Sequence, residues 1–232
     1  MRQAWLVSIA TALVLLGASI LPFLTPAWVA FEQDRTEVTR LTGFNATDVR
    51  AVTGSILGDL VVGRGDFDAT LAGVPVLDAS ERQHLRDVRG VFQGVYLLVL
   101  AAAVTLALTR RRARERDSRS TWWRAVRRGG AGLAVVVAIL GAVSLVAFDA
   151  AFEVFHRLFF APGTYLFDPA TSHLVQLFPD QFWFETTVVL GVVLVFAAAL
   201  TAWFAGRRAD RAAAIPSTGA QPDRLAVSSV AR

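Results

Sequence analysis

Four long apolar segments limit what this chain can fold into. They cover roughly residues 5–24, 91–108, 130–148 and 186–205, and each is close to the roughly 20 apolar residues that an α-helix needs to cross a bilayer. Inside hydrocarbon, every backbone N–H and C=O group must find its partner within the protein, so such segments fold as helices. We therefore expect an all-α membrane protein with four transmembrane helices and an outward-facing, partly helical loop domain.

The composition supports a membrane protein and excludes several classes of site. Of the 232 residues, 54% are hydrophobic and only 18% are charged, against about 25% in an average soluble protein. The chain has no cysteine, which excludes disulfides, thiolate metal sites and a cysteine nucleophile. Its net charge of +4 comes from arginines that cluster beside the apolar segments, so we expect no nucleic-acid partner.

The distribution of arginine predicts the topology. Residues 110–128 hold nine arginines against two acids, and three more arginines follow the fourth apolar segment. The positive-inside rule places such segments in the cytoplasm. We therefore expect both termini to lie in the cytoplasm. The expected parts are a membrane domain at 1–206, outer loops at 30–89 and 149–185, an inner basic loop at 110–128, and a disordered tail at 207–232.

The first apolar segment has a second interpretation. Arg2 and the small residues Gly17, Ala18 and Ser19 also fit the basic end and the cleavage site of a signal peptide. The apolar run continues past that site and is longer than the usual hydrophobic region of a signal peptide. We therefore favour a first span that is retained.

The first outer loop contains the beginnings of two helices. Asn45 can cap a helix over residues 46–62, which could lie on the membrane, close over a site or pack into a small subdomain. Its apolar face would consist of Val49, Val52, Ile56, Leu57 and Leu60. Ser80 and Gln83 form a capping-box pattern, and from Glu81 one helix can continue to Leu108. That helix would be about 42 Å long, so its first two turns should stand outside the hydrocarbon.

Ionisable residues gather at the outer ends of the apolar segments. The middles of the four segments carry essentially none, which argues against a proton pump, a voltage sensor or an ion channel. In a bundle of up-and-down helices the outer ends come together, so we expect His84 and His156 to face each other. Two polar sets each fall on one helical face, namely Glu81, His84 and Asp87, and Asp149, Glu153 and His156.

We expect at least one carboxylate on each face to orient its histidine and to favour the imidazolium form. The third histidine, His173, lies in a short helix that Asp168 should cap, with Pro169 at its first position, and we interpret it as structural. The aromatic side chains of this region form either an interfacial belt or the wall of a slot for acyl chains. They are Phe152, Phe155, Phe159, Phe160, Phe167, Phe178, Phe182 and Trp183.

Two phrases of the sequence closely resemble a known family. They are SERQHLRDVRGVF (80–92) and FHRLFFAPGTYLFDPATSHLVQLFPDQFW (155–183), and they resemble a bacterial four-span family that includes the lipoprotein intramolecular transacylases. The resemblance implies an enzyme that moves an acyl chain within a diacylglyceryl-modified lipoprotein, from glycerol to the α-amine of the N-terminal cysteine. The product is a lyso-form lipoprotein. The resemblance also implies that His84 and His156 are catalytic, because they match the family's two motif histidines.

The residues fit such chemistry. Acyl migration within one molecule needs no nucleophile from the enzyme, but it needs a base, because an α-amine of pKa about 7.7–8.0 is largely protonated at neutral pH. Histidine is the side chain best matched to that task. The implied partners are membrane lipids and acylated lipoprotein N-termini, with no metal ion and no other cofactor. The residues expected to orient or support the two histidines are Glu81, Asp87, Arg89, Asp149, Glu153 and Asp168.

Two other functions stay open on the sequence alone. His84 and His156 with nearby carboxylates could hold zinc in a metal-dependent membrane hydrolase, although no HExxH-like spacing is present. The chain could also be a non-catalytic membrane partner or assembly factor, in which case neither histidine would be essential.

Overall fold

The computed structural model describes residues 2–63, 65–115 and 118–214. In these ranges the chain is mostly helical. The elements in chain order are α1 (Arg2–Ile20), the 3₁₀ helix η1 (Leu21–Leu24), α2 (Pro26–Arg35), α3 (Val38–Thr42), α4 (Ala46–Val61), β1 (Thr70–Leu71), β2 (Val74–Pro75), α5 (Ala79–Glu115), α6 (Arg119–Val146), α7 (Phe148–Phe159), α8 (His173–Leu177) and α9 (Asp180–Ala213).

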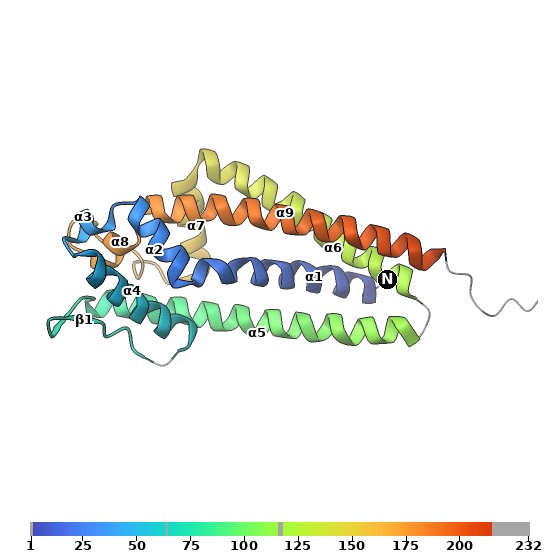
Figure 1. Cartoon of the computed structure of the whole chain (residues 1–232), viewed down its shortest axis with the longest axis horizontal. Coiled ribbons are helices and arrows are strands. Elements are labelled where there is room, and N and C mark those ends of the chain that lie inside the picture. Colours follow the sequence, from blue (N-terminus) through green and yellow to red (C-terminus); the bar gives the residue numbers. More distant parts are fainter. Residues whose placement is uncertain (1, 64, 116–117, 215–232) are drawn as a thin grey trace, which may run out of the picture.

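Four long helices form the body of the molecule. α1 with η1, α5, α6 and α9 are each long and apolar enough to cross a membrane, and they run along the long axis of the molecule (Figure 1). Large apolar side chains point outward from them; Phe196 of α9, for example, is 70% exposed. Such side chains suit contact with lipid, so the prediction of an all-α membrane protein with four spans is confirmed.

Small residues let the long helices approach one another. A Cβ atom at Gly129 of α6 would collide with the Ser8 carbonyl oxygen of α1, and one at Gly130 would lie 2.8 Å from the Ala198 carbonyl oxygen of α9. The Ser8 hydroxyl also donates a hydrogen bond to the Ala125 carbonyl oxygen, at 2.8 Å. Close approach and interhelical hydrogen bonds hold helices together where lipid is as apolar as the side chains. α1 is therefore an integral part of the bundle, as a retained span requires.

The short elements form a lobe at one end of the bundle. α2, α3, α4, the hairpin of β1 and β2, and α8 gather there beside the first turns of α5 (Figure 1). In the hairpin, Thr70 pairs with Pro75 and Leu71 with Val74. Asn45 caps α4 as predicted, by accepting a hydrogen bond from the Asp48 N–H.

The apolar face of α4 explains why the lobe folds. The face turns inward and joins a core with residues from both loops, so α4 belongs to a packed subdomain. The buried members of that core are Val38, Val49, Val52, Ile56, Phe67, Ala69, Val76, Leu77, Leu85, Leu174 and Leu177.

α5 begins with a different capping box from the predicted one. Asp78 Oδ1 accepts hydrogen bonds from the N–H groups of Ser80 and Glu81, at 2.7 and 2.8 Å, and Glu81 Oε2 accepts from the Asp78 N–H at 2.7 Å. The box predicted for Ser80 and Gln83 is wrong, because Asp78 offers an acceptor two residues earlier. Gln83 instead donates to Asp87 on the outside of the helix.

The long helices differ from the predicted spans at three ends. α6 stops at Val146, where Ala147 leaves the helical region with φ −140° and ψ 54°, so Asp149, Glu153 and His156 lie on the separate helix α7. α5 has 37 residues, about 55 Å, so its charged ends extend beyond a hydrocarbon core of about 30 Å. α9 continues to Ala213, so residues 207–213 are helical, and the predicted disorder there is wrong. The rest of the predicted tail, 215–232, lies outside the described residues.

We propose that the lobe faces the outside of the cell and that the arginine-rich helix ends face the cytoplasm. Because the chain has no cysteine of its own, single cysteines report position cleanly. Asp68→Cys and Thr171→Cys should react with a membrane-impermeant thiol reagent in intact cells, whereas Ser118→Cys should react only after permeabilisation. Reaction of Ser118→Cys in intact cells would reverse the proposed topology.

Candidate active site

His84 of α5 and His156 of α7 meet beside the lobe. Their ring centroids lie 6.0 Å apart and their planes differ by 21°. Each side chain is only 8% exposed. The structure thus brings together the two histidines that the sequence singled out, although they are 72 residues apart in the chain.

Aromatic rings enclose the two histidines, and we call this group the aromatic collar. Phe160 contacts both, with centroid distances of 4.9 Å to His84 and 5.5 Å to His156. Tyr165 lies 5.0 Å from His156, and Phe167 lies 5.6 Å from His84. The collar consists of Phe152, Phe155, Phe160, Tyr165 and Phe167.

The predicted aromatic set divides between several places. Four of its members are in the collar, whereas Phe178 and Phe182 pack against apolar clusters of the lobe. Phe159 and Trp183 are exposed. Neither a simple belt nor a simple wall describes the whole set.

The surroundings of His84 keep it neutral. His84 lies in the charged outer turns of α5, before the apolar part of that helix. Burial, reinforced by repulsion from His156, lowers the pKa of His84 from 6.5 to about 4, and Asp87 opposes this only in part. The buried Nδ1 atom of His84 has no hydrogen-bond partner among the described residues. The expectation of an imidazolium form is therefore wrong for His84, because desolvation outweighs one nearby carboxylate.

A backbone contact fixes the tautomer of His156. Its Nδ1 atom lies 2.8 Å from the Phe152 carbonyl oxygen, one helical turn earlier. A carbonyl oxygen only accepts hydrogen bonds, so Nδ1 carries the proton and donates it. The neutral ring then presents its lone pair at Nε2, the nitrogen of His156 that is suited to act as a base.

Glu81 does not orient His84, although both lie on the outer turns of α5. It is 2% exposed, and its Oε1 atom accepts hydrogen bonds from the Ser172 hydroxyl at 2.6 Å and the Leu174 N–H at 2.8 Å. Glu81 thus joins the start of α5 to the N-terminus of α8. It supports the site through the backbone rather than through a contact with the imidazole.

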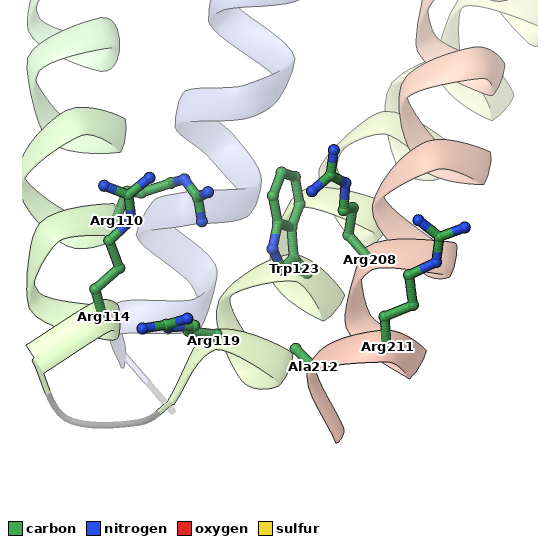
Figure 2. A pocket seen from close by; sticks show the side chains of 7 residues that line it. All are labelled: Arg110, Arg114, Arg119, Trp123, Arg208, Arg211 and Ala212. Atoms are coloured by element: carbon green, nitrogen blue, oxygen red, sulfur yellow. The ribbon is translucent and has the colours of Figure 1, made fainter. Parts of the chain in front are cut away.

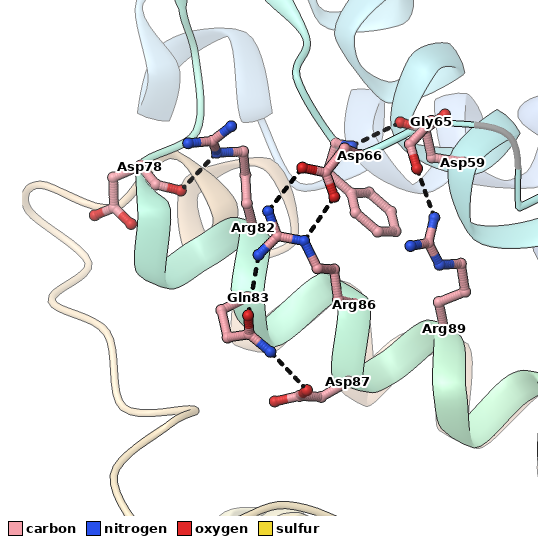
Figure 3. Close-up of polar contacts among 10 residues, drawn as sticks. Asp59, Gly65, Asp66, Asp78, Arg82, Gln83, Arg86, Asp87 and Arg89 are labelled. Carbon is pink, nitrogen blue, oxygen red and sulfur yellow. Dashed lines mark hydrogen bonds and ion pairs between the residues drawn. The ribbon is translucent and has the colours of Figure 1, made fainter.

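Asp87 and Arg89 form their hydrogen bonds with residues other than His84. Asp87 accepts a hydrogen bond from Gln83, and Arg89 donates to the Gly65 carbonyl oxygen at 2.6 Å (Figure 3). Arg86 forms two hydrogen bonds to the carboxylate of Asp66, at 2.6 and 2.8 Å. The contacts of Arg86 and Arg89 fasten the first turns of α5 to the segment that follows α4.

The carboxylates of α7 form no hydrogen bond with His156 in the part of the chain that the structure describes. Asp149 is exposed in the first turn of α7. Glu153 accepts hydrogen bonds from Arg157 at 2.7 Å and from the Tyr165 hydroxyl at 3.3 Å, so it holds Tyr165 against His156. The prediction that a carboxylate on each face orients its histidine finds no supporting hydrogen bond among the described residues. The Phe152 carbonyl oxygen binds Nδ1 of His156, and Nδ1 of His84 is buried without a partner.

Asp168 and His173 shape the second outer loop. The Asp168 backbone and side chain accept hydrogen bonds from the N–H groups of the next turn, but the cap of α8 is Ser172, which accepts from the Val175 N–H. The predicted cap at Asp168 is therefore wrong, because the helix starts five residues later. His173 stacks on Phe44 at 5.2 Å, in the lobe.

No three His, Asp or Glu side chains among the described residues lie close enough together to hold a metal ion. The hydrolase alternative therefore gains no support from the arrangement of these side chains. The bonds of Ser172 to Glu81 and of Tyr165 to Glu153 have no local signal in the sequence, since each joins two separate segments. The cap that Ser172 forms on α8 does have one, because serine is a common N-cap residue.

Comparisons with known proteins identify the family of this chain. A family model described as lipoprotein intramolecular transacylase Lit matches residues 5–183. The chain belongs to this family. Lit proteins are acyltransferases, so the chain is an enzyme of that class rather than a non-catalytic membrane partner.

Solved structures show the same fold. The lipoprotein intramolecular transacylase Lit from Bacillus cereus matches with a TM-score of 0.75 at 14% identity, over 90% of this chain and 95% of that one. Two further structures of that protein, with a histidine replaced by arginine or by alanine, match with TM-scores of 0.73 and 0.72. At the same 14% identity they cover 90% of this chain and 92% and 93% of those chains, respectively. Curated protein sequences give no match.

The burial of His84 predicts an unusual titration. In detergent-solubilised protein with isotope-labelled histidine, NMR should show His84 still neutral at pH 5.5. Because the folded-state pKa lies below 6.5, the unfolded chain binds the proton more tightly, and the protein should lose stability as the pH falls below 6.5. The His84→Gln variant assigns the signal. A midpoint near 6.5 for His84 would contradict the inferred burial.

Proposed function

We propose that this protein moves an acyl chain within a diacylated lipoprotein, from the glycerol to the α-amine of the N-terminal cysteine. Its membership of the Lit family supports acyl transfer between groups of one lipoprotein. The observation that carries the proposal is the pair of buried imidazoles, 6.0 Å apart, within the aromatic collar. Two histidines in a dry site at the end of a membrane bundle suit proton transfer on a lipid-anchored substrate.

His156 is the proposed general base. The α-amine nitrogen attacks the ester carbonyl carbon and passes its proton to His156 Nε2. The tetrahedral intermediate then expels the glycerol oxygen, which takes the proton from the imidazolium. An N–C bond forms, a C–O bond breaks, and His156 returns to its starting state. The hydrogen bond from Nδ1 to the Phe152 carbonyl oxygen would stabilise the positive charge that develops on the ring.

His84 is the proposed oxyanion donor. A histidine whose pKa is about 4 cannot supply a full positive charge at neutral pH, but its neutral ring still has an N–H group. Neutral imidazoles serve as electrophiles in enzymes where the pKa of histidine is lowered. An N–H directed at the developing oxyanion typically contributes about 10²–10³-fold to the rate.

The surface of α7 supports access from the membrane. His156 is buried, whereas Val154, Phe155, Leu158 and Phe159 of the same helix are exposed. An apolar outer face beside the catalytic ring suits a helix that lies at the lipid boundary. A substrate held in the outer leaflet by its acyl chains would then reach the collar without leaving the membrane. Holding ester and amine together can remove about 7–11 kcal/mol of the barrier.

The two roles predict different responses to substitution. His84→Ala and His156→Ala should each slow conversion of a diacylated lipopeptide to its N-acyl, lyso product by about 10²–10⁴-fold. His84→Asn should recover part of the activity, because an amide N–H can still donate to the oxyanion. His156→Asn should recover none, because an amide is not a base. The assay is mass spectrometry of the product formed in nanodiscs.

His173→Ala is the matched control, since that histidine stacks on Phe44 in the lobe, and it should keep most of the activity. If His156→Asn recovered activity and His84→Asn did not, His84 would be the general base and His156 the oxyanion donor. Full activity in either alanine variant, with the protein correctly inserted, would remove that histidine from the mechanism.

A further inference from the structure

A second polar site lies at the other end of the bundle. A cavity of about 450 Å³ opens between the ends of α5, α6 and α9 (Figure 2). Arg110 of α5 lies 26 residues beyond His84, which is about 39 Å along the helix. The two sites therefore face opposite sides of the membrane. The cavity is lined by Arg110, Arg114, Arg119, Trp123, Arg208, Arg211 and Ala212.

The charges of this cavity are not neutralised within the described residues. None of its five arginines forms an ion pair within 4.0 Å there, since Glu115 at the end of α5 pairs with Arg111 instead. Arg110 experiences repulsion from Arg114, Arg119 and Arg208. An anion in the cavity would relieve that repulsion.

Two tryptophans restrain the guanidinium group of Arg110. The Arg110 guanidinium lies 5.0 Å from the Trp122 ring and 4.7 Å from the Trp123 ring. Trp122 is itself fixed by a hydrogen bond from Nε1 to the Thr109 hydroxyl, at 3.1 Å. A guanidinium restrained by cation–π contacts has less freedom to lose when it binds a ligand.

Exposed apolar side chains lie beside the charged cavity on α9. Phe204 lies one helical turn toward the middle of the bundle from Arg208, whose guanidinium is 4.8 Å from its ring, and it is 44% exposed. Trp203, also exposed, lies beside it in the sequence. A ligand that carries both a charged group and hydrocarbon chains could use both surfaces at once, whereas a soluble anion would use only the first.

We propose that this cavity binds the phosphate group of an anionic phospholipid in the leaflet opposite the histidine site. Arginine pairs with phosphate through two parallel hydrogen bonds, and the cavity volume falls within the range of small-ligand sites, about 300–1,000 Å³. Basic pockets between the cytoplasmic ends of transmembrane helices typically bind such head groups. The proposal does not depend on the proposed acyl transfer.

Native mass spectrometry of the full chain in detergent tests the site. The probe is an equal mixture of phosphatidylglycerol and phosphatidylcholine with the same acyl chains. The protein should retain phosphatidylglycerol preferentially. The triple variant Arg110→Gln, Arg119→Gln, Arg208→Gln should bind phosphatidylglycerol at least about tenfold more weakly, with its binding of phosphatidylcholine unchanged and its thermal unfolding still cooperative.

The matched control removes three arginines from the same three helix ends but from outside the cavity, as Arg112→Gln, Arg124→Gln, Arg207→Gln. It should retain the preference for phosphatidylglycerol. An equal loss in both triple variants, or no preference in the unchanged protein, would overturn the proposal. Soluble glycerol phosphate at millimolar concentration should not displace the lipid. Complete displacement would assign the cavity to a soluble phosphate and would overturn its assignment to a lipid.

Discussion

The carboxylate of Glu81 joins the two outer segments on which the histidine pair depends. It is buried, and its two oxygens accept hydrogen bonds from Asp78 at the start of α5 and from Ser172 and Leu174 at the start of α8. Because a buried carboxylate without partners would cost several kcal/mol, the lobe must supply these donors whenever α5 is folded. His84 lies one turn after Glu81. The contact that closes the helix end therefore also holds the second outer loop, with its aromatic residues, against the imidazole.

The two ends of the bundle differ in how they treat charge. At the lobe, aromatic rings remove water from the histidines, and the pKa of His84 falls because its charged form loses hydration. At the other end, five arginines share a cavity without carboxylate partners among the described residues. The first arrangement suits proton transfer between neutral groups, and the second suits an anion that comes from outside the protein. Both sites lie near the ends of α5, where the helix carries polar and charged residues rather than apolar ones.

Hydropathy and helical periodicity predict the four spans, the capped helix α4 and the meeting of His84 with His156, because these depend on patterns within single segments and on up-and-down packing. The break between α6 and α7 has no such signal, since LVAFDAAFE contains neither Pro nor Gly and reads as continuous helix. Glu81 shares a face with His84 in sequence, but Ser172, 91 residues later, decides where its carboxylate binds. The neutral state of His84 likewise depends on Phe160 and Phe167, whose approach no local pattern predicts.

The paired histidines are proposed to serve acyl transfer on lipoproteins. Tandem mass spectrometry of lipoprotein N-termini measures this most directly, in a bacterial host whose lipoproteins are normally diacylated. Expression of this chain should convert the N-terminal cysteine to a form with one acyl chain on the α-amine and one on glycerol, at unchanged total acyl content. The His156→Ala variant should leave the diacylglyceryl form. Lipoproteins that keep the diacylglyceryl form in cells with correctly inserted wild-type protein would contradict a role in acyl transfer.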